Sequence, residues 1–443
     1  MAKTYSGGIP FKRNLADTDK KIAFCPDRIL LPLSKGAKCL VKEGDEIKKY
    51  SMIASKTPAS PALFCGVGGR VEHKFRASGR TALSIVTDKD APSEEPLPTP
   101  KKKLADMSQE ELEELLKTRG IPAIKQGKRE PRCLIVDCGA SPHDLSRLHI
   151  CQAHPDKVVA GAKIIMKLLR ARSCKFALPN SNLDAARSIE KRLPSRTKMF
   201  SIVFIKDKLP AFIPHLTVAA VCNLEISRAK DVFDAGYPVI SPLLCLACYN
   251  ALVDGIPFCE GFLTVTDKDG STKILSLPFG SELDKTVDIP KKYTLARAEG
   301  LYGKSAINSI MTPYTEAVRV VPDNDKVTPP SPCIECRRCI GACPARLIPI
   351  DIYRKVKTGK ADQGLDYYAA GCFECRACTH VCPSHIPLAE AIIKLRRESG
   401  IITVDIPDGD PDFYTDGEPG KLPAESEVKA PHNEEEKRDD KQD

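Results

Sequence analysis

The chain has 443 residues, of which 42% are hydrophobic and 28% charged, and this composition excludes a wholly disordered or collagen-like protein. Its net charge of +9 is uneven, because the last 43 residues hold 14 acidic and 5 basic side chains and leave a strongly basic body. A basic body suits an acidic protein, a nucleotide, an anionic membrane or nucleic acid. The start lacks an apolar signal segment and no run of about 18 apolar residues follows, which predicts a cytoplasmic protein.

The first part of the chain is expected to form a β-rich unit. Residues 40–54 read as a strand, a Gly-Asp turn and a second strand, a pattern similar to the barrel-sandwich modules of biotinyl and lipoyl carriers. In a carrier the modified lysine lies in a Met-Lys-Met or Asp-Lys-Ala sequence, and Lys56 lies in neither. We therefore predict a barrel-sandwich hybrid over residues 1–90, with Lys56 as an ordinary surface lysine.

A proline-rich linker over residues 91–107 precedes a segment in which strands and helices alternate. Ser108 and Glu111 are spaced as a capping box, which predicts that a helix begins there. Further elements are expected as strands at 133–137, 175–178, 199–205 and 217–222, with helices at 157–172 and 182–193. This alternation predicts a parallel sheet flanked by helices, a Rossmann-like α/β domain over residues 108–224.

The next region is expected to contain a helix near residues 241–254 and a hairpin whose strands, 261–266 and 273–277, are joined by an Asp-Lys-Asp-Gly turn. A β-grasp element of the SLBB type over residues 225–295 fits this pattern. A helical domain is predicted over 296–400, and the acidic, proline-rich tail over 401–443 is predicted to be disordered. The expected fold class is therefore a multidomain α+β protein.

Nineteen cysteines without a secretion signal indicate metal-binding thiolates rather than disulfides. The run C-x2-C-x2-C-x3-C-P occurs twice, and it is the run that binds [4Fe–4S] clusters in two-cluster ferredoxins, where its fourth cysteine binds the other cluster. Zinc sites usually pair two C-x2-C units or use histidine, so the spacing favours iron. The predicted ligands are Cys333, Cys336, Cys339 and Cys382 for one cluster, and Cys372, Cys375, Cys378 and Cys343 for the second.

The remaining cysteines carry weaker patterns. Cys245 and Cys248 are spaced as a C-x2-C pair, which is found both in redox dithiols and in half of a metal site. Their apolar surroundings, without basic neighbours, predict buried core thiols instead. The same interpretation applies to Cys133, Cys138, Cys151 and Cys259.

The order of these parts resembles the RnfC-type subunits of Rnf electron-transport complexes and their soluble relatives. The likeness covers most of residues 5–397, and only the paired cysteine runs are highly specific. It implies electron transfer, with a reductase or the subunits of an Rnf-type complex as redox partners. The stretches that carry it, besides the cysteine runs, are 6–9, 31–37, 41–45, 231–236, 254–257 and 262–266.

The sequence departs from this family where FMN and NADH would bind. The family has a Gly-x-Gly-Gly-Ala-x-Phe-Pro loop that holds FMN, followed by an Asn-Gly-Ala-Glu-Cys-Glu-Pro stretch at the nucleotide site. Residues 118–128 keep only Gly120 and Gly127, and residues 136–143 lack both glutamates. We therefore do not expect FMN or NADH to bind, and we interpret the α/β domain as a scaffold.

Three functions are compared on these grounds. The prediction is an iron–sulfur relay that passes electrons between redox partners through two [4Fe–4S] clusters, without a catalytic acid, base or nucleophile of its own. The alternative is an FMN-containing, NADH-oxidising RnfC subunit of a membrane-associated NADH:ferredoxin complex. A nucleic-acid-binding protein is disfavoured, because aromatic residues are 6% of the chain and no basic-aromatic stripe is present. Docking to a membrane complex would place the protein on the cytoplasmic face of the membrane.

Overall fold

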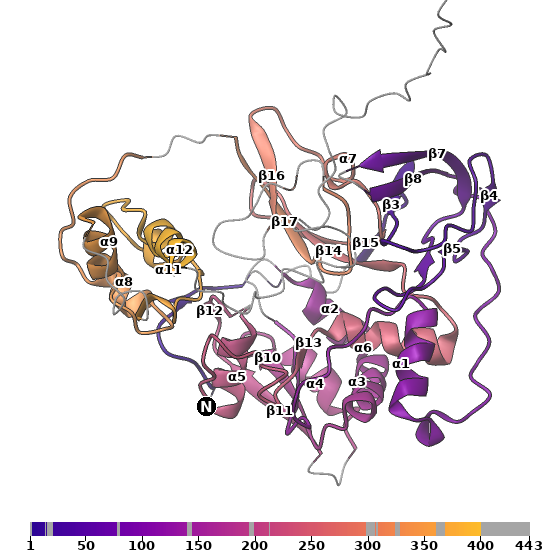
Figure 1. Cartoon of the computed structure of the whole chain (residues 1–443), viewed down its shortest axis with the longest axis horizontal. Coiled ribbons are helices and arrows are strands. Elements are labelled where there is room, and N and C mark those ends of the chain that lie inside the picture. The colour runs from indigo at the N-terminus through magenta and orange to yellow at the C-terminus, as the bar shows by residue number, and fades with distance from the viewer. Residues whose placement is uncertain are drawn as a thin grey trace, which may run out of the picture.

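The computed structural model describes residues 2–13, 15, 21–77, 80–139, 144–194, 199–211, 213–297, 306, 309–323, 328–359 and 368–399. Figure 1 shows a small helical domain beside a parallel sheet and its helices, with two further β units on the other side. The tail predicted over residues 401–443 lies outside the described residues. The result is a mixed α/β architecture that ends in a small cysteine-rich domain.

The N-terminal β unit is built around a four-stranded antiparallel sheet of order β3-β8-β7-β4. A separate pair, β5 and β6, closes over it, and the enclosed core contains Ile29, Leu31, Ile53 and Leu83. Lys56 lies on the surface, where it forms an ion pair with Glu114. The strands are β3 (Arg28–Pro32), β4 (Glu46–Ile47), β5 (Met52–Ala54), β6 (Leu63–Phe64), β7 (Gly69–Ala77) and β8 (Arg80–Thr87).

The α/β domain has a parallel sheet of order β11-β10-β9-β13 with helices on both faces. Alternate residues of β9 face opposite cores, because Leu134 and Val136 join one apolar cluster and Ile135 the other. Its strands are β9 (Leu134–Asp137), β10 (Cys174–Pro179), β11 (Phe200–Ile205) and β13 (Val239–Ile240). Its helices are α1 (Gln109–Thr118), α2 (Ser146–Ala153), α3 (Pro155–Leu169), α4 (Leu183–Glu190), α5 (Pro214–Cys222) and α6 (Pro242–Tyr249), which a π turn (Asn250–Asp254) extends; a 3-10 turn (Leu104–Asp106) precedes α1.

One prediction for this domain is confirmed and another is wrong. The capping box is confirmed, because the Ser108 side chain accepts from the Glu111 N–H and the Glu111 carboxylate accepts from the Ser108 N–H. The strand predicted at residues 217–222 is wrong, since this segment is helix α5. Pro214 occupies the first turn of α5, and Asn223 ends it in a left-handed conformation.

The second β unit is a five-stranded sheet of order β16-β17-β14-β15-β2. The predicted hairpin is present, with β14 and β15 antiparallel. The sheet continues beyond the predicted boundary at residue 295, because β17 pairs with β14 and with β16. The elements are β2 (Lys21–Ala23), β14 (Glu260–Thr266), β15 (Thr272–Pro278), β16 (Tyr293–Arg297) and β17 (Ala317–Pro322), with the short helix α7 (Leu283–Thr286).

The cysteine-rich domain consists of short helices and connecting loops. Helices α9 and α12 pack together around Ile352, Ile392 and Leu395. A second small core contains Leu388 and Ile393. The N-terminal segment runs beside this domain and pairs β1 (Ile9–Pro10) with β12 (Lys208–Leu209). The helices are α8 (Arg338–Ala342), α9 (Pro349–Lys357), α11 (Ala377–His380) and α12 (Leu388–Glu398).

Candidate iron–sulfur site

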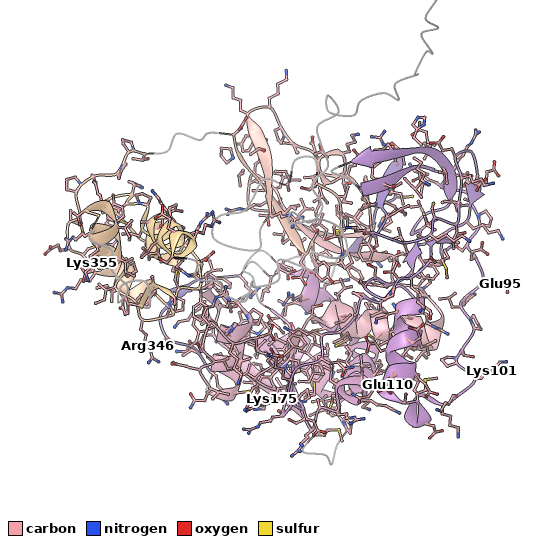
Figure 2. The ribbon with its side chains drawn as sticks, viewed as in Figure 1. Glu95, Lys101, Glu110, Lys175, Arg346 and Lys355 are labelled. Atoms are coloured by element: carbon pink, nitrogen blue, oxygen red, sulfur yellow. The ribbon has the colours of Figure 1, made fainter. Side chains whose placement is uncertain are left out.

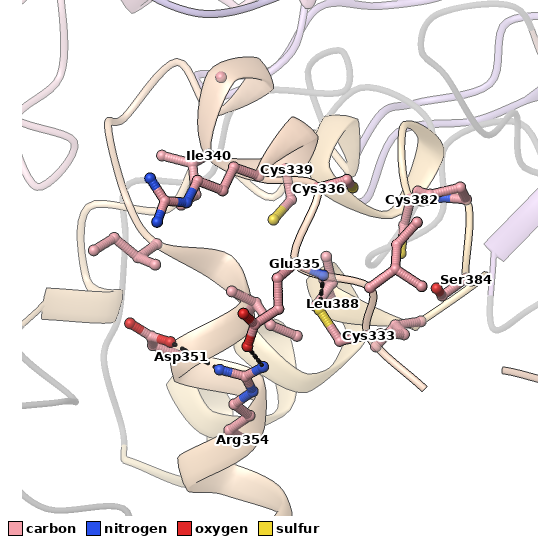
Figure 3. Close-up of a pocket in the computed structure, with 17 residues that line it drawn as sticks. Cys333, Glu335, Cys336, Cys339, Ile340, Asp351, Arg354, Cys382, Ser384 and Leu388 are labelled. Carbon is pink, nitrogen blue, oxygen red and sulfur yellow. Dashed lines mark hydrogen bonds and ion pairs between the residues drawn. The ribbon is translucent and has the colours of Figure 1, made fainter. Parts of the chain in front are cut away.

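The first predicted ligand set surrounds one cavity. Figure 3 shows the first three cysteines of the first run and the last cysteine of the second run around one cavity. The volume of this cavity is about 650 Å³. The sulfur of Cys382 therefore lies with the first run, although 39 residues separate it from Cys343, the last cysteine of that run. The four cysteines are Cys333, Cys336, Cys339 and Cys382.

The second predicted set is also brought together. Cys343 packs with Cys372 in one small core, and its thiol is close enough to interact electrostatically with Cys375 and Cys378. Each set thus contains three cysteines of one run and the fourth of the other. Nowhere in the described ranges do three His, Cys, Asp or Glu side chains converge as ligands of a single metal ion would. Four thiolates that each bind a different iron of a cubane need wider spacing than ligands of one zinc.

The two cysteine runs have the same backbone conformation. Glu335 and Arg337 flank Cys336 with φ of 58° each, and Glu374 and Arg376 flank Cys375 with φ of 56° and 59°. Left-handed residues other than glycine cost roughly 1–2 kcal/mol each. Their repetition at matching positions indicates that the loops are shaped for a ligand, and this conformation was not predicted from the sequence.

This conformation turns backbone N–H groups toward the sulfurs. The N–H of Glu335 donates to Cys333 Sγ at 3.4 Å, and the N–H of Glu374 donates to Cys372 Sγ at 3.3 Å. The N–H of Leu347 donates to Cys343 Sγ at 3.3 Å. Concave arrays of N–H groups of this kind are typical of anion and iron–sulfur sites. The donor set and the cysteines therefore fit a cubane cluster.

Burial keeps the thiols of the second set protonated in the absence of a metal. It raises the pKa of Cys372 to about 11 and the pKa of Cys375 to about 12. Nearby thiols of the same set contribute to both of these raised values. Because metal binding requires the thiolate form, binding at this set releases protons and compensates the cost of burying charge.

The N-terminal segment contacts the second set directly. The N–H of Gly8 donates to the carbonyl of Ala342 at 3.0 Å, and Arg346 donates to Ser6 Oγ at 3.0 Å. A Cβ added to Gly7, which has φ of 62°, would lie 2.4 Å from the carbonyl oxygen of Cys343. Figure 2 places Arg346 where the cluster domain meets the α/β domain. Gly7 is thus required by close packing against a predicted ligand, whereas a Cβ on Gly8 would meet Leu209 and Tyr5.

We expect Gly7→Ala to loosen this contact. The left-handed backbone costs about 1 kcal/mol with alanine, and the clash with Cys343 adds about 1–3 kcal/mol. The rate of trypsin cleavage within residues 3–13 should rise in the iron-loaded protein. The control is Gly36→Ala, which has φ of 80° and nothing within 4 Å of the added Cβ. Equal cleavage rates in the two variants would contradict the packing argument.

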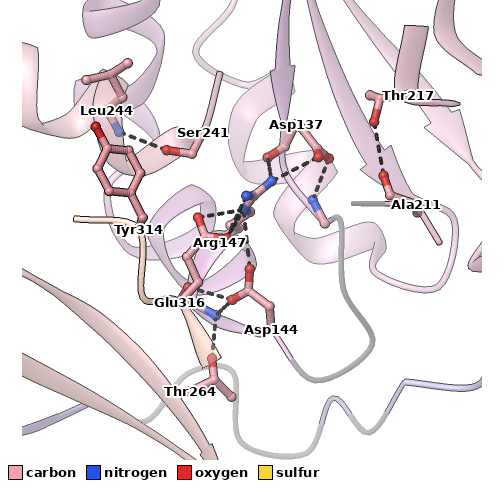
Figure 4. Close-up of polar contacts among 12 residues, drawn as sticks. Asp137, Asp144, Arg147, Ala211, Thr217, Ser241, Leu244, Thr264, Tyr314 and Glu316 are labelled. Atoms are coloured by element: carbon pink, nitrogen blue, oxygen red, sulfur yellow. Dashed lines mark hydrogen bonds and ion pairs between the residues drawn. The ribbon is translucent and has the colours of Figure 1, made fainter. Parts of the chain in front are cut away.

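A largely buried charge network lies at the carboxyl end of β9, in the stretch that the sequence resemblance compares with a nucleotide site (Figure 4). Arg147 of α2 donates to Asp137, at the carboxyl end of β9, at 2.9 Å, and to Glu316, before β17, at 2.6 Å. Its Nε lies 3.3 Å from Asp144. Burial lowers the pKa of Arg147, but the three carboxylates together raise it above its usual value. The guanidinium of Arg147 therefore occupies the described part of the sheet edge at the carboxyl end of β9.

The two glycines of the degenerate loop pack against protein backbone. A Cβ on Gly120 would lie 3.1 Å from the carbonyl oxygen of Phe258, and one on Gly127 would lie 2.1 Å from that of Phe233. Lys125 is not a free basic side chain, since it forms an ion pair of 2.8 Å with Asp231. Packing accounts for both glycines. Residues 140–143, which include the remainder of the second stretch, lie outside the described part of the chain.

The six cysteines that were predicted to be core thiols are buried, namely Cys133, Cys138, Cys151, Cys245, Cys248 and Cys259. Cys133 also shares a hydrogen bond with Cys222, whose sulfur lies 4.0 Å from Lys175 Nζ. None of these cysteines lines the cavity of the first ligand set.

The comparisons with known proteins agree with this site. Residues 332–386 match a family described as a 4Fe-4S dicluster domain. The class defined by the site is therefore a protein with a 4Fe-4S dicluster domain.

Relatives similar to most of the chain are the C components of ion-translocating complexes. The C component of the Na(+)-translocating ferredoxin:NAD(+) oxidoreductase complex of Acetobacterium woodii is 22% identical, covering 79% of this chain and 86% of that protein. Its counterpart in the proton-translocating complex of Clostridium ljungdahlii is 23% identical over 81% of this chain and 87% of that protein. The C component of the ion-translocating oxidoreductase complex of Methanosarcina acetivorans is 24% identical over 80% of this chain and 88% of that protein. The predicted resemblance to the RnfC type is confirmed.

Among solved structures, an NAD+-reducing [NiFe]-hydrogenase in the air-oxidized state is similar to this chain with a TM-score of 0.42 and 10% identity. The match covers 66% of this chain and 63% of the hydrogenase chain.

Proposed function

We propose that this chain is an iron–sulfur electron-transfer subunit of the RnfC type, which relays electrons between redox partners. The observation that carries the proposal is the pair of cysteine sets, each made of three cysteines from one run and one from the other. Two bound [4Fe–4S] clusters would supply one-electron redox chemistry at two sites. The cluster ligands would be Cys333, Cys336, Cys339 and Cys382 for one, and Cys372, Cys375, Cys378 and Cys343 for the other.

The protein residues would hold and tune these groups. Backbone N–H groups aimed at the sulfurs favour the more negative, reduced state of a bound cluster. Arg396 is buried beside the second set, where it donates to the carbonyl of Cys372 at 2.9 Å and forms an ion pair with Glu374. It fixes the position of the loop that carries Cys372 and Cys375.

The units around the cluster domain would serve as scaffold and docking surfaces. The antiparallel N-terminal sheet with its separate strand pair supports a barrel-sandwich hybrid, and the β14–β15 hairpin supports a β-grasp element. In the described ranges no helix is both long and apolar enough to cross a membrane. The likeness to components of ion-translocating complexes supports a peripheral place on the cytoplasmic face of the membrane, without nucleic-acid binding.

We further propose that the chain receives its electrons from a partner protein rather than from NADH through FMN. The buried Arg147 network and the packing of Gly120 and Gly127 support this. The alternative is an FMN-containing subunit that oxidises NADH, which the likeness to components of ferredoxin:NAD(+) oxidoreductase complexes favours.

An anaerobic titration separates the two functions. Flavin, iron and sulfide are first measured on the purified protein, and NADH and then dithionite are added while the visible spectrum is recorded. We expect about eight iron atoms per chain, no flavin, and bleaching by dithionite only. Bound flavin, with bleaching of its absorbance and then of the cluster absorbance by NADH, would establish the alternative. Absence of iron would overturn the electron-transfer function itself.

A further inference from the structure

We infer that the loop of the first cysteine run is a docking surface for an acidic one-electron carrier protein, an inference that rests on the proposed electron-transfer function. The starting point is the equivalence of the two loops. They share sequence spacing and the same left-handed positions, so each residue of one loop has a counterpart in the other. Differences between counterparts therefore report differences in what covers each loop.

The loop of the second run is covered by the rest of the chain. Phe373, directly after the first cysteine of this run, packs against the α/β core. The centroid of its ring lies 5.8 Å from that of His215 on α5. Cys375 packs against the same core. Cys372 is 9% exposed, whereas its counterpart Cys333 is only partly buried. A group bound by this set faces the interior of the protein.

The loop of the first run has no such cover among the described residues. The counterpart of Phe373 is Ile334, which is 67% exposed, the largest exposure among the large hydrophobic side chains that the structure describes. Cys336 is exposed as well, whereas its counterpart Cys375 is partly covered. Because transfer between proteins requires close approach, the first set is the one that a partner can reach.

The charges around Ile334 specify the partner. Glu335 and Asp351 are both engaged by Arg354, at 3.2 and 3.8 Å, so their negative charge is compensated. Arg337 lines the cavity and is exposed, and no ion-pair partner for it is found among the described residues. Arg338, the next residue of the same loop, adds exposed positive charge.

An apolar centre with a basic rim is complementary to a partner that presents an acidic rim. The counterpart of Arg337 in the second loop is Arg376, which lies 3.4 Å from Glu390. The excess of uncompensated positive charge is therefore a feature of the first loop. These observations favour an acidic carrier protein over a basic one.

The test measures association of the iron-loaded chain with an acidic ferredoxin, and with basic cytochrome c as the probe of opposite charge, under anaerobic conditions. We expect the ferredoxin to bind, the affinity to fall as salt rises from about 0.05 to about 0.5 M, and cytochrome c to bind at least tenfold more weakly. Arg337→Glu should weaken ferredoxin binding by about tenfold. The matched control Arg376→Glu, at the equivalent position of the other loop, should change it by less than about twofold.

Iron content is measured on every variant, and Arg337→Gln replaces Arg337→Glu if the latter loses iron, with an expected weakening of about threefold. Equal effects of the Arg337 and Arg376 substitutions, no effect of either, or equal binding of cytochrome c would overturn the docking surface. Reduction of the clusters by dithionite with no salt-dependent binding of ferredoxin would overturn the docking surface alone and leave the electron-transfer function standing. If the purified chain contained no iron, the proposed electron-transfer function would be overturned instead.

Discussion

Replacing Cys382 with alanine is expected to remove the cluster bound by the first cysteine run, although Cys382 belongs to the second run. Its side chain lines the cavity of Cys333, Cys336 and Cys339, so its loss leaves one iron of that cubane without a protein ligand. Iron should fall from about eight to about four atoms per chain. Iron and sulfide analysis, with the EPR spectrum of the dithionite-reduced protein, measures this loss.

Double variants decide between crossed and uncrossed ligation. Cys336→Ala combined with Cys382→Ala should lose no more iron than either single variant, because both residues serve one cluster. Cys375→Ala combined with Cys382→Ala should lose nearly all iron, because the two residues serve different clusters. If each run held its own cluster, the two results would be exchanged. Cys343→Ala is expected to behave like Cys375→Ala.

The two cysteine runs could be recognised in the sequence because their spacing is short-range: three thiolates lie within seven residues and a fourth follows a short helix. The crossed ligation came instead from the known pattern of two-cluster ferredoxins, and it stays a prediction. The capping box at Ser108 was predicted for the same reason, since all its contacts lie within four residues.

Helix α5 was not predicted, because local preference and tertiary context conflict there. Thr217, Val218 and Val221 are β-branched and favour a strand. Pro214 at the start and the burial of Leu216 and Val218 against the parallel sheet favour the helix. Tertiary packing overrides propensity in such segments.

The Arg147 network was missed for a different reason. Arg147 and Glu316 are 169 residues apart in the sequence, and neither lies in a recognisable motif. The exposure of Ile334 could not be predicted either, because its cysteine run and that of Phe373 have the same spacing. Only the docking of one run against α5 distinguishes them.

The Arg147 network lies at the carboxyl edge of the parallel sheet, where it links three segments of the chain that are distant in sequence. In this chain three carboxylates and one guanidinium close the described part of that edge and connect β9, α2 and the segment before β17. These mutually dependent charges join the α/β domain to the second β unit.

Arg147→Met is expected to destabilise the protein by about 3–5 kcal/mol, because it removes the positive charge that faces the buried carboxylates of Asp137 and Asp144. The change is measured as the shift of the urea unfolding transition followed by far-UV circular dichroism. The matched control is Arg187→Met on α4. Arg187 forms an ion pair of 3.2 Å with Asp184 but is well exposed, and its loss should cost less than about 1 kcal/mol.

The pH dependence of the Arg147→Met variant identifies the cause. Burial already raises the pKa of Asp137 in the native protein, although Arg147 opposes that rise. Without Arg147 the pKa rises further, so the native variant binds protons more readily than the unfolded chain. The penalty is therefore full above the raised pKa of Asp137, shrinks as pH falls through that pKa, and is lost as pH approaches the pKa of the unfolded chain. A deficit that stays constant with pH would mean that lost packing, and not uncompensated charge, causes the instability.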